Sequence, residues 1–249
     1  MEAFLSLLNE AVVIKFLLLL ARILSFVAFM PVYGHSAVSP KIRVTFSFFV
    51  TIFLFPIIEV KNLVTQDMFV LSLISEITLG AVAAFFVHII FSAVRIIGEL
   101  IEYSTALSMA NMFDPATGTQ EGVVNRFLYM VALVLFFETG MYEMTFVILV
   151  KSFSIIHLGY FDIFSYDGIQ IIIDEINRLF AFSFSFALPL FFIAFILDLY
   201  YGYGTRSMPA FSPFVITFQL KFAVIFLFLI FGMEIFTHSF TNFFINKFQ

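Results

Sequence analysis

The run AVVIKFLLLLARILSFVAFM, residues 11–30, sets the class of structure that this chain can adopt. It is twenty residues long and carries only two charged side chains, Lys15 and Arg22. A helix needs about twenty predominantly apolar residues to cross the hydrocarbon core of a bilayer. Because lipid offers no hydrogen-bond partners to the backbone, such a segment must satisfy its own N–H and C=O groups, as a helix does. The run therefore predicts a transmembrane helix near the start of the chain.

Five more apolar blocks follow, and the chain has no ten-residue alternation of the kind found in membrane β-barrels. The second of the six blocks is shorter than a membrane span, which fits a tilted, kinked or protein-buried helix. We therefore predict an all-α, multi-pass helical membrane protein with about six apolar segments. After Ala11–Met30, the blocks are Val44–Ile58, Met68–Ile97, Phe127–Val150, Leu179–Leu197 and Phe214–Phe236.

The composition excludes several classes of protein. Of the 249 residues, 62% are hydrophobic and only 12% are charged, about half the charged content of an average soluble domain. Cysteine is absent, so disulfides and thiolate chemistry are ruled out. The net charge of −5 gives no basic surface for nucleic acid, so we expect no nucleic-acid partner. Glu2 and Glu10 stand where a signal peptide carries positive charge, so we expect the first helix to be retained.

The fourth apolar block is interrupted at its centre. Glu138-Thr139-Gly140-Met141-Tyr142-Glu143 places two carboxylates and a glycine between apolar residues. Charges are costly in a helix that faces lipid. Two arrangements fit the block, a continuous helix with charges inside it or a hairpin of two short helices packed within a larger assembly.

Charged residues also occur inside or at the edges of other apolar blocks. A buried charge must be paired, or must belong to a path for ions or protons. No helix carries a series of acidic residues, so pairing between helices is the better interpretation. Glu76 and Gly80 lie four residues apart, hence on one helix face, where the glycine permits close helix packing. Pro189 should kink the fifth block.

No motif for catalysis or for a cofactor is present. The sequence contains no His-Glu-x-x-His, no G-x-S-x-G and no phosphate-binding glycine loop. The four histidines are scattered without metal-ligand spacing. Gly202-Tyr203-Gly204 resembles part of a potassium-channel filter but lacks the preceding Thr-Val. We expect neither an enzyme nor a bound cofactor or metal.

Four stretches together resemble one family of membrane proteins. Two of the stretches are short and lie in the middle of the chain. The second stretch is Glu76 with Gly80, and the third runs from Gly98-Glu99-Leu100-Ile101 into Met109–Pro115. Their order along the chain resembles the flagellar biosynthetic protein FliR family, the R subunit of type III export gates. This chain departs from the family's usual residues at Ala106 and at Pro209-Ala210-Phe211-Ser212. The first stretch comprises Arg22, Pro31, Gly34, Pro40, Arg43 and Pro56, and the fourth comprises Asp198, Gly202, Arg206, Pro209 and Lys221.

The resemblance implies a single export-gate domain over residues 1–249, built of bent helical hairpins. It implies a non-catalytic subunit in the bacterial inner membrane, within the flagellar basal body, that passes unfolded export substrates. The family's partners are FliP-, FliQ- and FlhB-like proteins, with membrane lipid around them. On the same resemblance we assign packing and assembly roles to Arg22, Glu76, Gly80, Gly98, Asp198, Gly202, Arg206 and Lys221.

The resemblance also implies a pore plug in the segment after the third apolar block, residues 111–122. Met112 and Phe113 supply flexible and bulky apolar surface, and apolar constrictions exclude hydrated ions. Without the resemblance, an ordinary polar turn between helices, with a helix start at Asp114-Pro115, would be the better explanation of the segment. The predicted plug residues are Asn111, Met112, Phe113, Asp114, Pro115 and Gly118.

Two other functions compete with the export gate. A secondary transporter or small-solute channel would use discontinuous helices, for which Pro189 and the break near Gly140 are the available evidence. Such transporters commonly carry an inverted repeat, and none is visible here. A membrane-embedded enzyme would need clustered His, Asp or Ser side chains, which are missing.

Overall fold

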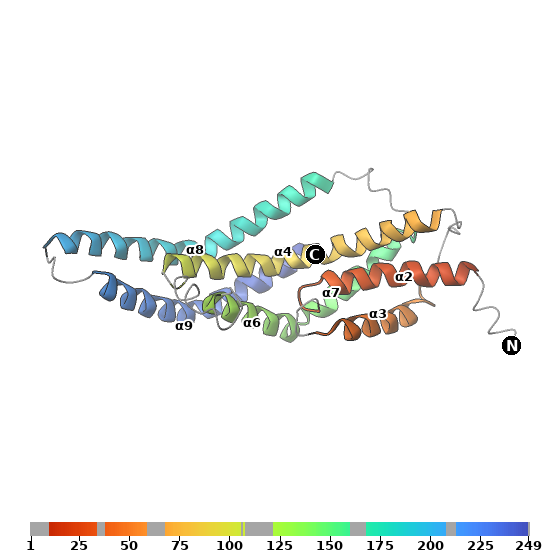
Figure 1. Ribbon diagram of the computed structural model, residues 1–249, viewed down its shortest axis with the longest axis horizontal. Helices are drawn as coiled ribbons and strands as arrows, with labels where there is room; N and C mark the ends of the chain where they lie inside the picture. The colour runs from red at the N-terminus through yellow and green to blue at the C-terminus, as the bar shows by residue number, and fades with distance from the viewer. Residues whose placement is uncertain are drawn as a thin grey trace. The chain divides into compact units, whose positions relative to one another are not determined.

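A computed structural model covers residues 1–249. It describes residues 10–33, 38–58, 68–105, 107, 122–159, 168–207 and 213–248. Within these ranges the chain forms helices and no strands, which confirms the all-α prediction (Figure 1). The helices are α2 (Glu10–Phe29), α3 (Pro40–Leu54), α4 (Phe69–Ser104), α6 (Val123–Glu138), α7 (Met141–Ile155), α8 (Gly168–Ser207) and α9 (Pro213–Phe248).

Four of these helices are long and apolar enough to cross a membrane, namely α2, α4, α8 and α9. The pair α6 and α7 can add a fifth span, because the two helices pass the same test together. The multi-pass prediction is therefore confirmed. Helix α3 has 15 residues, so the second apolar block forms a helix that is too short to cross a bilayer unaided.

The fourth apolar block forms two short helices. This excludes the first of the two predicted arrangements, a continuous helix with charges inside it. Helices α6 and α7 meet at a bend of 68°. Helix α6 ends at Glu138, and Gly140 has a φ of +73°, a conformation that glycine adopts without the strain of a Cβ. Both carboxylates lie at helix ends, since Glu143 is in the first turn of α7.

Helix α8 bends without being interrupted. It runs for 40 residues with Pro189 inside it, and Figure 1 shows α8 changing direction part-way along its length. Proline removes one backbone donor and its ring crowds the preceding turn. We therefore attribute the bend to Pro189, as the sequence predicts.

The contacts divide the chain into two compact units. Unit 1 comprises residues 1–89 and 142–172, and unit 2 comprises residues 90–141 and 173–249. Helix α4 contributes to both, because it extends across residue 89. In unit 1, α2 packs along α3.

The core of unit 2 is built largely from phenylalanine. Phe91 and Phe136 meet edge to face with ring centroids 5.6 Å apart, and both are almost fully buried. Phe240 adds an edge-to-face contact to Phe91, and Phe244 adds one to Phe136. Such pairs add stability beyond the area that they bury. Part of the chain's phenylalanine content thus serves packing between α4, α6 and α9.

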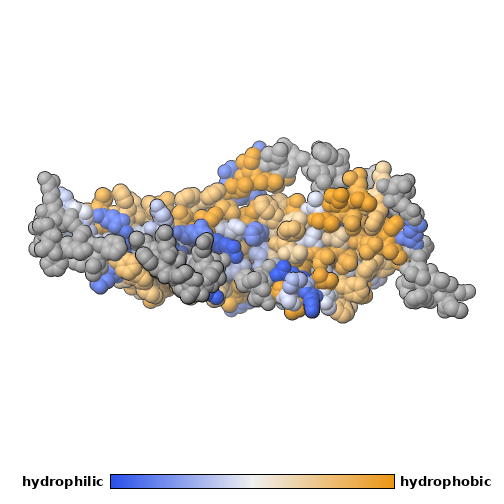
Figure 2. All heavy atoms as spheres, viewed as in Figure 1, coloured by the Kyte–Doolittle hydropathy of each residue, from blue (hydrophilic) through white to orange (hydrophobic). Residues whose placement is uncertain are grey.

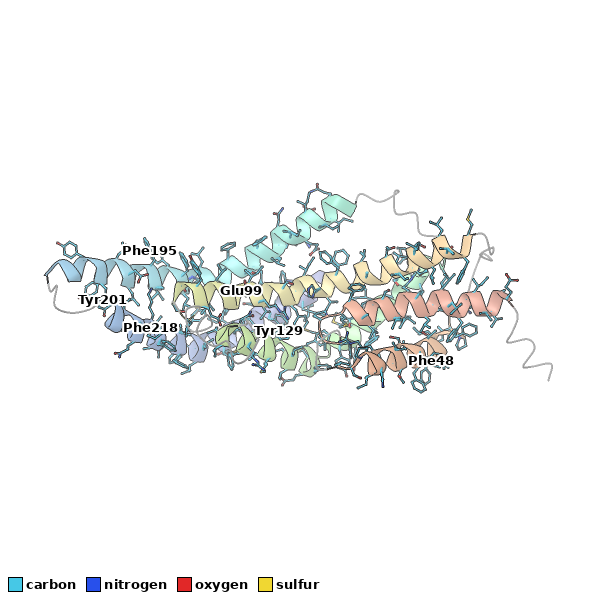
Figure 3. The ribbon with its side chains drawn as sticks, viewed as in Figure 1. Phe48, Glu99, Tyr129, Phe195, Tyr201 and Phe218 are labelled. Atoms are coloured by element: carbon cyan, nitrogen blue, oxygen red, sulfur yellow. The ribbon has the colours of Figure 1, made fainter. Side chains whose placement is uncertain are left out.

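Other apolar side chains lie on the surface. Figure 2 shows apolar residues over much of the visible face, and Phe195 of α8, labelled in Figure 3, is 50% exposed. Soluble monomers rarely expose apolar surface on this scale. The exposed faces therefore suit lipid or other protein chains.

Candidate functional site

The first polar cluster, cluster 1, centres on a buried ion pair in unit 1. The Arg22 guanidinium of α2 donates from Nη2 to Glu76 Oε1 of α4 at 3.0 Å, and from Nε to Glu76 Oε2. Arg22 is 1% exposed and Glu76 is fully buried. This two-point contact matches the planar fork of arginine to a carboxylate, so it fixes orientation as well as charge.

The end of α7 completes the same cluster. Arg22 Nη1 and Nη2 both donate to the Ile156 carbonyl at 3.1 Å, and the Gly159 N–H donates to Glu76 Oε1 at 2.8 Å. The Arg22 guanidinium also lies 4.3 Å from the centre of the Phe153 ring. One side chain from α2 thereby joins α4 to the end of α7.

Gly80 lies where α4 comes closest to α2. A Cβ at this position would overlap the Arg22 carbonyl oxygen and Ser25 Oγ. Ser25 Oγ itself donates to the Arg22 carbonyl at 3.0 Å. The glycine therefore permits the helix approach on which the Arg22–Glu76 pair depends.

The chemistry available to cluster 1 is structural. The Glu76 carboxylate accepts three hydrogen bonds, two of them from Arg22, so its charge is already paired within the cluster. Across the part of the chain that the structure describes, no three His, Asp or Glu side chains gather as metal ligands. Cluster 1 thus holds three helices together.

The second polar cluster, cluster 2, lies in unit 2 at the end of α4. One oxygen of the buried Glu102 carboxylate accepts hydrogen bonds from the N–H groups of Val124 at 2.6 Å and Asn125 at 3.0 Å. These are among the first N–H groups of α6, which have no partner within the helix. Gly122, the N-cap of α6, has no side chain to satisfy them. A carboxylate from another helix therefore takes the place of the usual capping side chain.

Two glycines make room for this cap. A Cβ on Gly122 would overlap the Glu102 carboxylate, and a Cβ on Gly98 would overlap the backbone of Asn125. Helix α4 therefore lies against the backbone of α6 at Gly98, and the Glu102 carboxylate lies against Gly122.

Lys221 of α9 also contacts the C-terminal end of α4. Its Nζ donates to the Ser104 carbonyl at 3.2 Å and lies 2.7 Å from both oxygens of Asp198 on α8. Lys221 is 8% exposed, whereas Asp198 is 54% exposed. A lysine at a helix C-terminus satisfies a carbonyl that has no partner within the helix. Cluster 2 thus joins α4, α6, α8 and α9.

The predicted assembly residues divide among these places. Arg22, Glu76 and Gly80 meet in cluster 1, while Gly98, Asp198 and Lys221 belong to cluster 2. A Cβ on Gly202 would meet nothing within 4 Å, so no close helix approach is found there among the described residues. Arg206 lies in α8, and its side chain is outside the described part. Of the predicted plug, residues 111–122, all but Gly122 also lie outside the described residues.

The role of Glu102 is not evident from the sequence. Glu102 precedes Val124 by 22 residues, and the usual capping motif places the acidic residue only three residues from the N-cap. The available signal was the start of α6, where Gly122 stands in place of Ser, Thr, Asp or Asn. The absence of a capping side chain at Gly122 indicates that another part of the chain caps the start of α6, but it does not identify the residue.

Replacing Glu102 with alanine should loosen α6 from α4. Two buried N–H groups would lose a charged acceptor, and hydrogen bonds to charged groups contribute about 1.5–3 kcal/mol each. We expect a lower thermal midpoint in detergent, measured by loss of the monodisperse peak in size-exclusion chromatography. Glu102→Gln should fall between wild type and Glu102→Ala, because an amide oxygen can still accept. Equal midpoints for all three chains would contradict the capping role.

Comparison with known proteins identifies the family. The sequence profile of "Bacterial export proteins, family 1" matches residues 13–246. The chain belongs to this family. The match spans both units and both polar clusters, and it confirms the resemblance to the FliR family.

Individual proteins that are similar to this chain have names that agree with the family match. Flagellar biosynthetic protein FliR of Bacillus subtilis (strain 168) is 28% identical over 223 residues, covering 88% of this chain and 86% of the relative. The protein of the same name from Aquifex aeolicus (strain VF5) is 26% identical over 243 residues, covering 97% and 93%. That of Escherichia coli (strain K12) is 27% identical over 206 residues, covering 82% and 78%. With its apolar helices, the chain is a multi-pass inner-membrane component of flagellar protein export.

Proposed function

We propose that the chain is a non-catalytic subunit of the flagellar type III export gate and forms part of the export pore with FliP- and FliQ-like partners, with an FlhB-like protein nearby. Residues 1–249 act as one export-gate domain in this proposal. The observation that carries it is the family match over residues 13–246. The buried charges support a structural role, because in both clusters they join helices to one another.

The exposed face of α9 supports a partner-dependent subunit. Five large apolar side chains on this helix are between 53% and 74% exposed. They form pairs that lie four residues apart along the helix, at 226/230, 227/231 and 231/235, so all five lie on one half of the helix surface. Such a stripe suits contact with lipid or with an apolar helix of another chain. The five are Phe226, Leu227, Ile230, Phe231 and Ile235.

Co-purification tests this proposal. The tagged chain, extracted from its native membrane in a mild detergent, should bring down FliP- and FliQ-like proteins in a stable complex. A variant with Phe226, Ile230 and Phe231 changed to serine should lose these partners while the tagged chain is still made. Recovery of the wild-type chain as a lone monomer that moves small solutes in liposomes would refute the export-gate function.

We further propose that residues 111–122 plug the closed pore, with Met112 and Phe113 as the sealing side chains. The support is the resemblance together with the apolar bulk of these two residues. Glu102 and Gly122 fix the chain at the two ends of the connection that carries the segment, so the plug would have anchored ends.

Changing both Met112 and Phe113 to serine should make cells leaky to ions and small molecules. Smaller polar side chains would let water into the apolar constriction and remove the barrier to hydrated ions. Uptake of a membrane-impermeant dye by growing cells measures the leak. Val123→Ser, at an exposed position beyond Gly122, is the control and should stay tight. Normal permeability in cells that contain the fully assembled double variant would exclude the plug.

One observation favours a solute transporter or channel as a second function. The 68° bend between α6 and α7 gives the chain a discontinuous helix pair of the kind that binds solutes in some transporters. Pro189 gives no equivalent break, because α8 continues through it. Solute uptake by liposomes containing the purified chain alone distinguishes this function from the export gate.

A further inference from the structure

A cavity of about 400 Å³ lies in unit 1 where α3 and α7 end. Its walls come from the turn that follows α3 and from the last residues of α7. Neither the proposed plug nor the two polar clusters requires a cavity at this place. Its lining therefore needs a separate explanation.

The polar part of the lining is basic. Lys151 and His157 both line the cavity, and neither side chain makes a hydrogen bond or an ion pair with the described part of the chain. Ser154 Oγ donates to the Lys151 carbonyl at 2.7 Å, so its lone pairs can still accept a hydrogen bond. No acidic side chain is among the described lining residues. The cavity therefore offers a cation, an imidazole and a hydroxyl to a ligand that carries negative charge.

The rest of the lining is apolar. Ile57, Ile58, Val150 and Phe153 form it, and Ile58 and Phe153 are nearly buried. Phe153 also stacks on the Arg22 guanidinium of cluster 1. A ligand that fills the cavity would thus press on a ring that packs against the Arg22–Glu76 pair.

We propose that this cavity binds an anionic phospholipid. The headgroup phosphate lies against Lys151 and His157, and the upper acyl chain follows Ile57 and Val150. Three observations carry this assignment: basic groups that have no partner among the described residues, apolar walls beside them, and a location at helix ends in a membrane protein. A phospholipid has the same arrangement of an anionic group next to hydrocarbon, and basic pockets between membrane helices bind such headgroups. A soluble phosphate ion would make no use of the apolar wall.

Lipid retention by the purified export complex tests the proposal. The complex is isolated through a tag on this chain and incubated with equal amounts of phosphatidylglycerol and phosphatidylcholine that have identical acyl chains. Native mass spectrometry then counts the bound lipids. We expect the wild type to retain phosphatidylglycerol preferentially. The double variant Lys151→Gln, His157→Gln should reduce that preference about tenfold, as loss of charge-assisted hydrogen bonds predicts.

Two further variants distinguish binding in the cavity from a general effect of positive charge on the chain. Ser154→Phe fills the cavity while leaving both basic residues, and it should also reduce the preference. Lys41→Gln removes an exposed lysine from the opposite end of α3 and should leave the preference unchanged.

Three results would overturn the proposal. The first is an unchanged preference in the Lys151→Gln, His157→Gln chain. The second is displacement of the bound anion by millimolar inorganic phosphate together with equal retention of both lipids, which would indicate a site for free anions. The third is a photo-reactive group at position 154 that cross-links to another protein and never to lipid, which would assign the cavity to a partner chain.

Discussion

Replacing Arg22 with methionine is expected to lower the thermal midpoint of the chain by about 6–20 °C, the equivalent of roughly 3–5 kcal/mol. The substitution keeps an unbranched apolar stem but leaves the fully buried Glu76 carboxylate without its cation. The Ile156 carbonyl and the Phe153 ring lose a contact as well. Midpoints measured in one detergent, with motility of the complemented strain, give the two readouts.

A double variant and an exposed pair provide the controls. Arg22→Met combined with Glu76→Leu should recover part of the lost stability, because no unpaired charge is left in the core. Arg178→Met removes one partner of the Arg178–Glu175 pair, whose arginine is 66% exposed, and should change the midpoint very little. If Arg22→Met and Arg178→Met lowered the thermal midpoint equally, the buried ion pair would stabilise the chain no more than the exposed pair does.

Replacing Gly98 with alanine is expected to separate α4 from α6. The new Cβ would overlap the Asn125 backbone, which cannot move aside as a flexible side chain could. Overpacking of this kind costs about 1–3 kcal/mol and sometimes more. It would also move Glu102 away from the start of α6, where its carboxylate accepts hydrogen bonds from the N–H groups of Val124 and Asn125. We expect a lower midpoint and reduced recovery of assembled complex after co-purification.

Gly204→Ala is the matched control, since Gly204 is also a glycine within a helix. A Cβ there meets nothing within 4 Å, so the change should be neutral or should stabilise α8 slightly. Loss of stability at Gly204 equal to that at Gly98 would show that helical glycines matter here for a reason other than close packing.

The class of fold could be predicted well from the sequence. Block Ala11–Met30 agrees with α2 to within one residue at each end, because lipid-facing helices are marked directly by hydropathy. Helix limits were harder where polar residues continue a helix. The block Leu179–Leu197 covers only the middle of α8, which extends over Gly168–Ser207. Helix formation needs only satisfied backbone hydrogen bonds, so it can continue past the apolar part.

The polar clusters could be predicted only in part. Arg22 and Glu76 each stand out as charges inside apolar blocks, but they are 54 residues apart, and no local pattern says that they meet. Glu102 carries no signal of its own, because a cap supplied by another helix depends on tertiary packing. The same limit applies to Lys221, whose contact with the Ser104 carbonyl spans 117 residues.

The exposed apolar side chains of α8 have a consequence for hydrophobic mismatch. They run from Ile171 to Tyr203. At 1.5 Å per residue this stretch is about 48 Å long, while the hydrocarbon core measures about 30 Å. A straight helix would have to lean by about 50° from the bilayer normal to hide all of it, beyond the usual range of about 0–40°. Even with its bend, α8 exposes apolar side chains over more length than a bilayer readily covers, and contact with neighbouring proteins would shield the remainder from water.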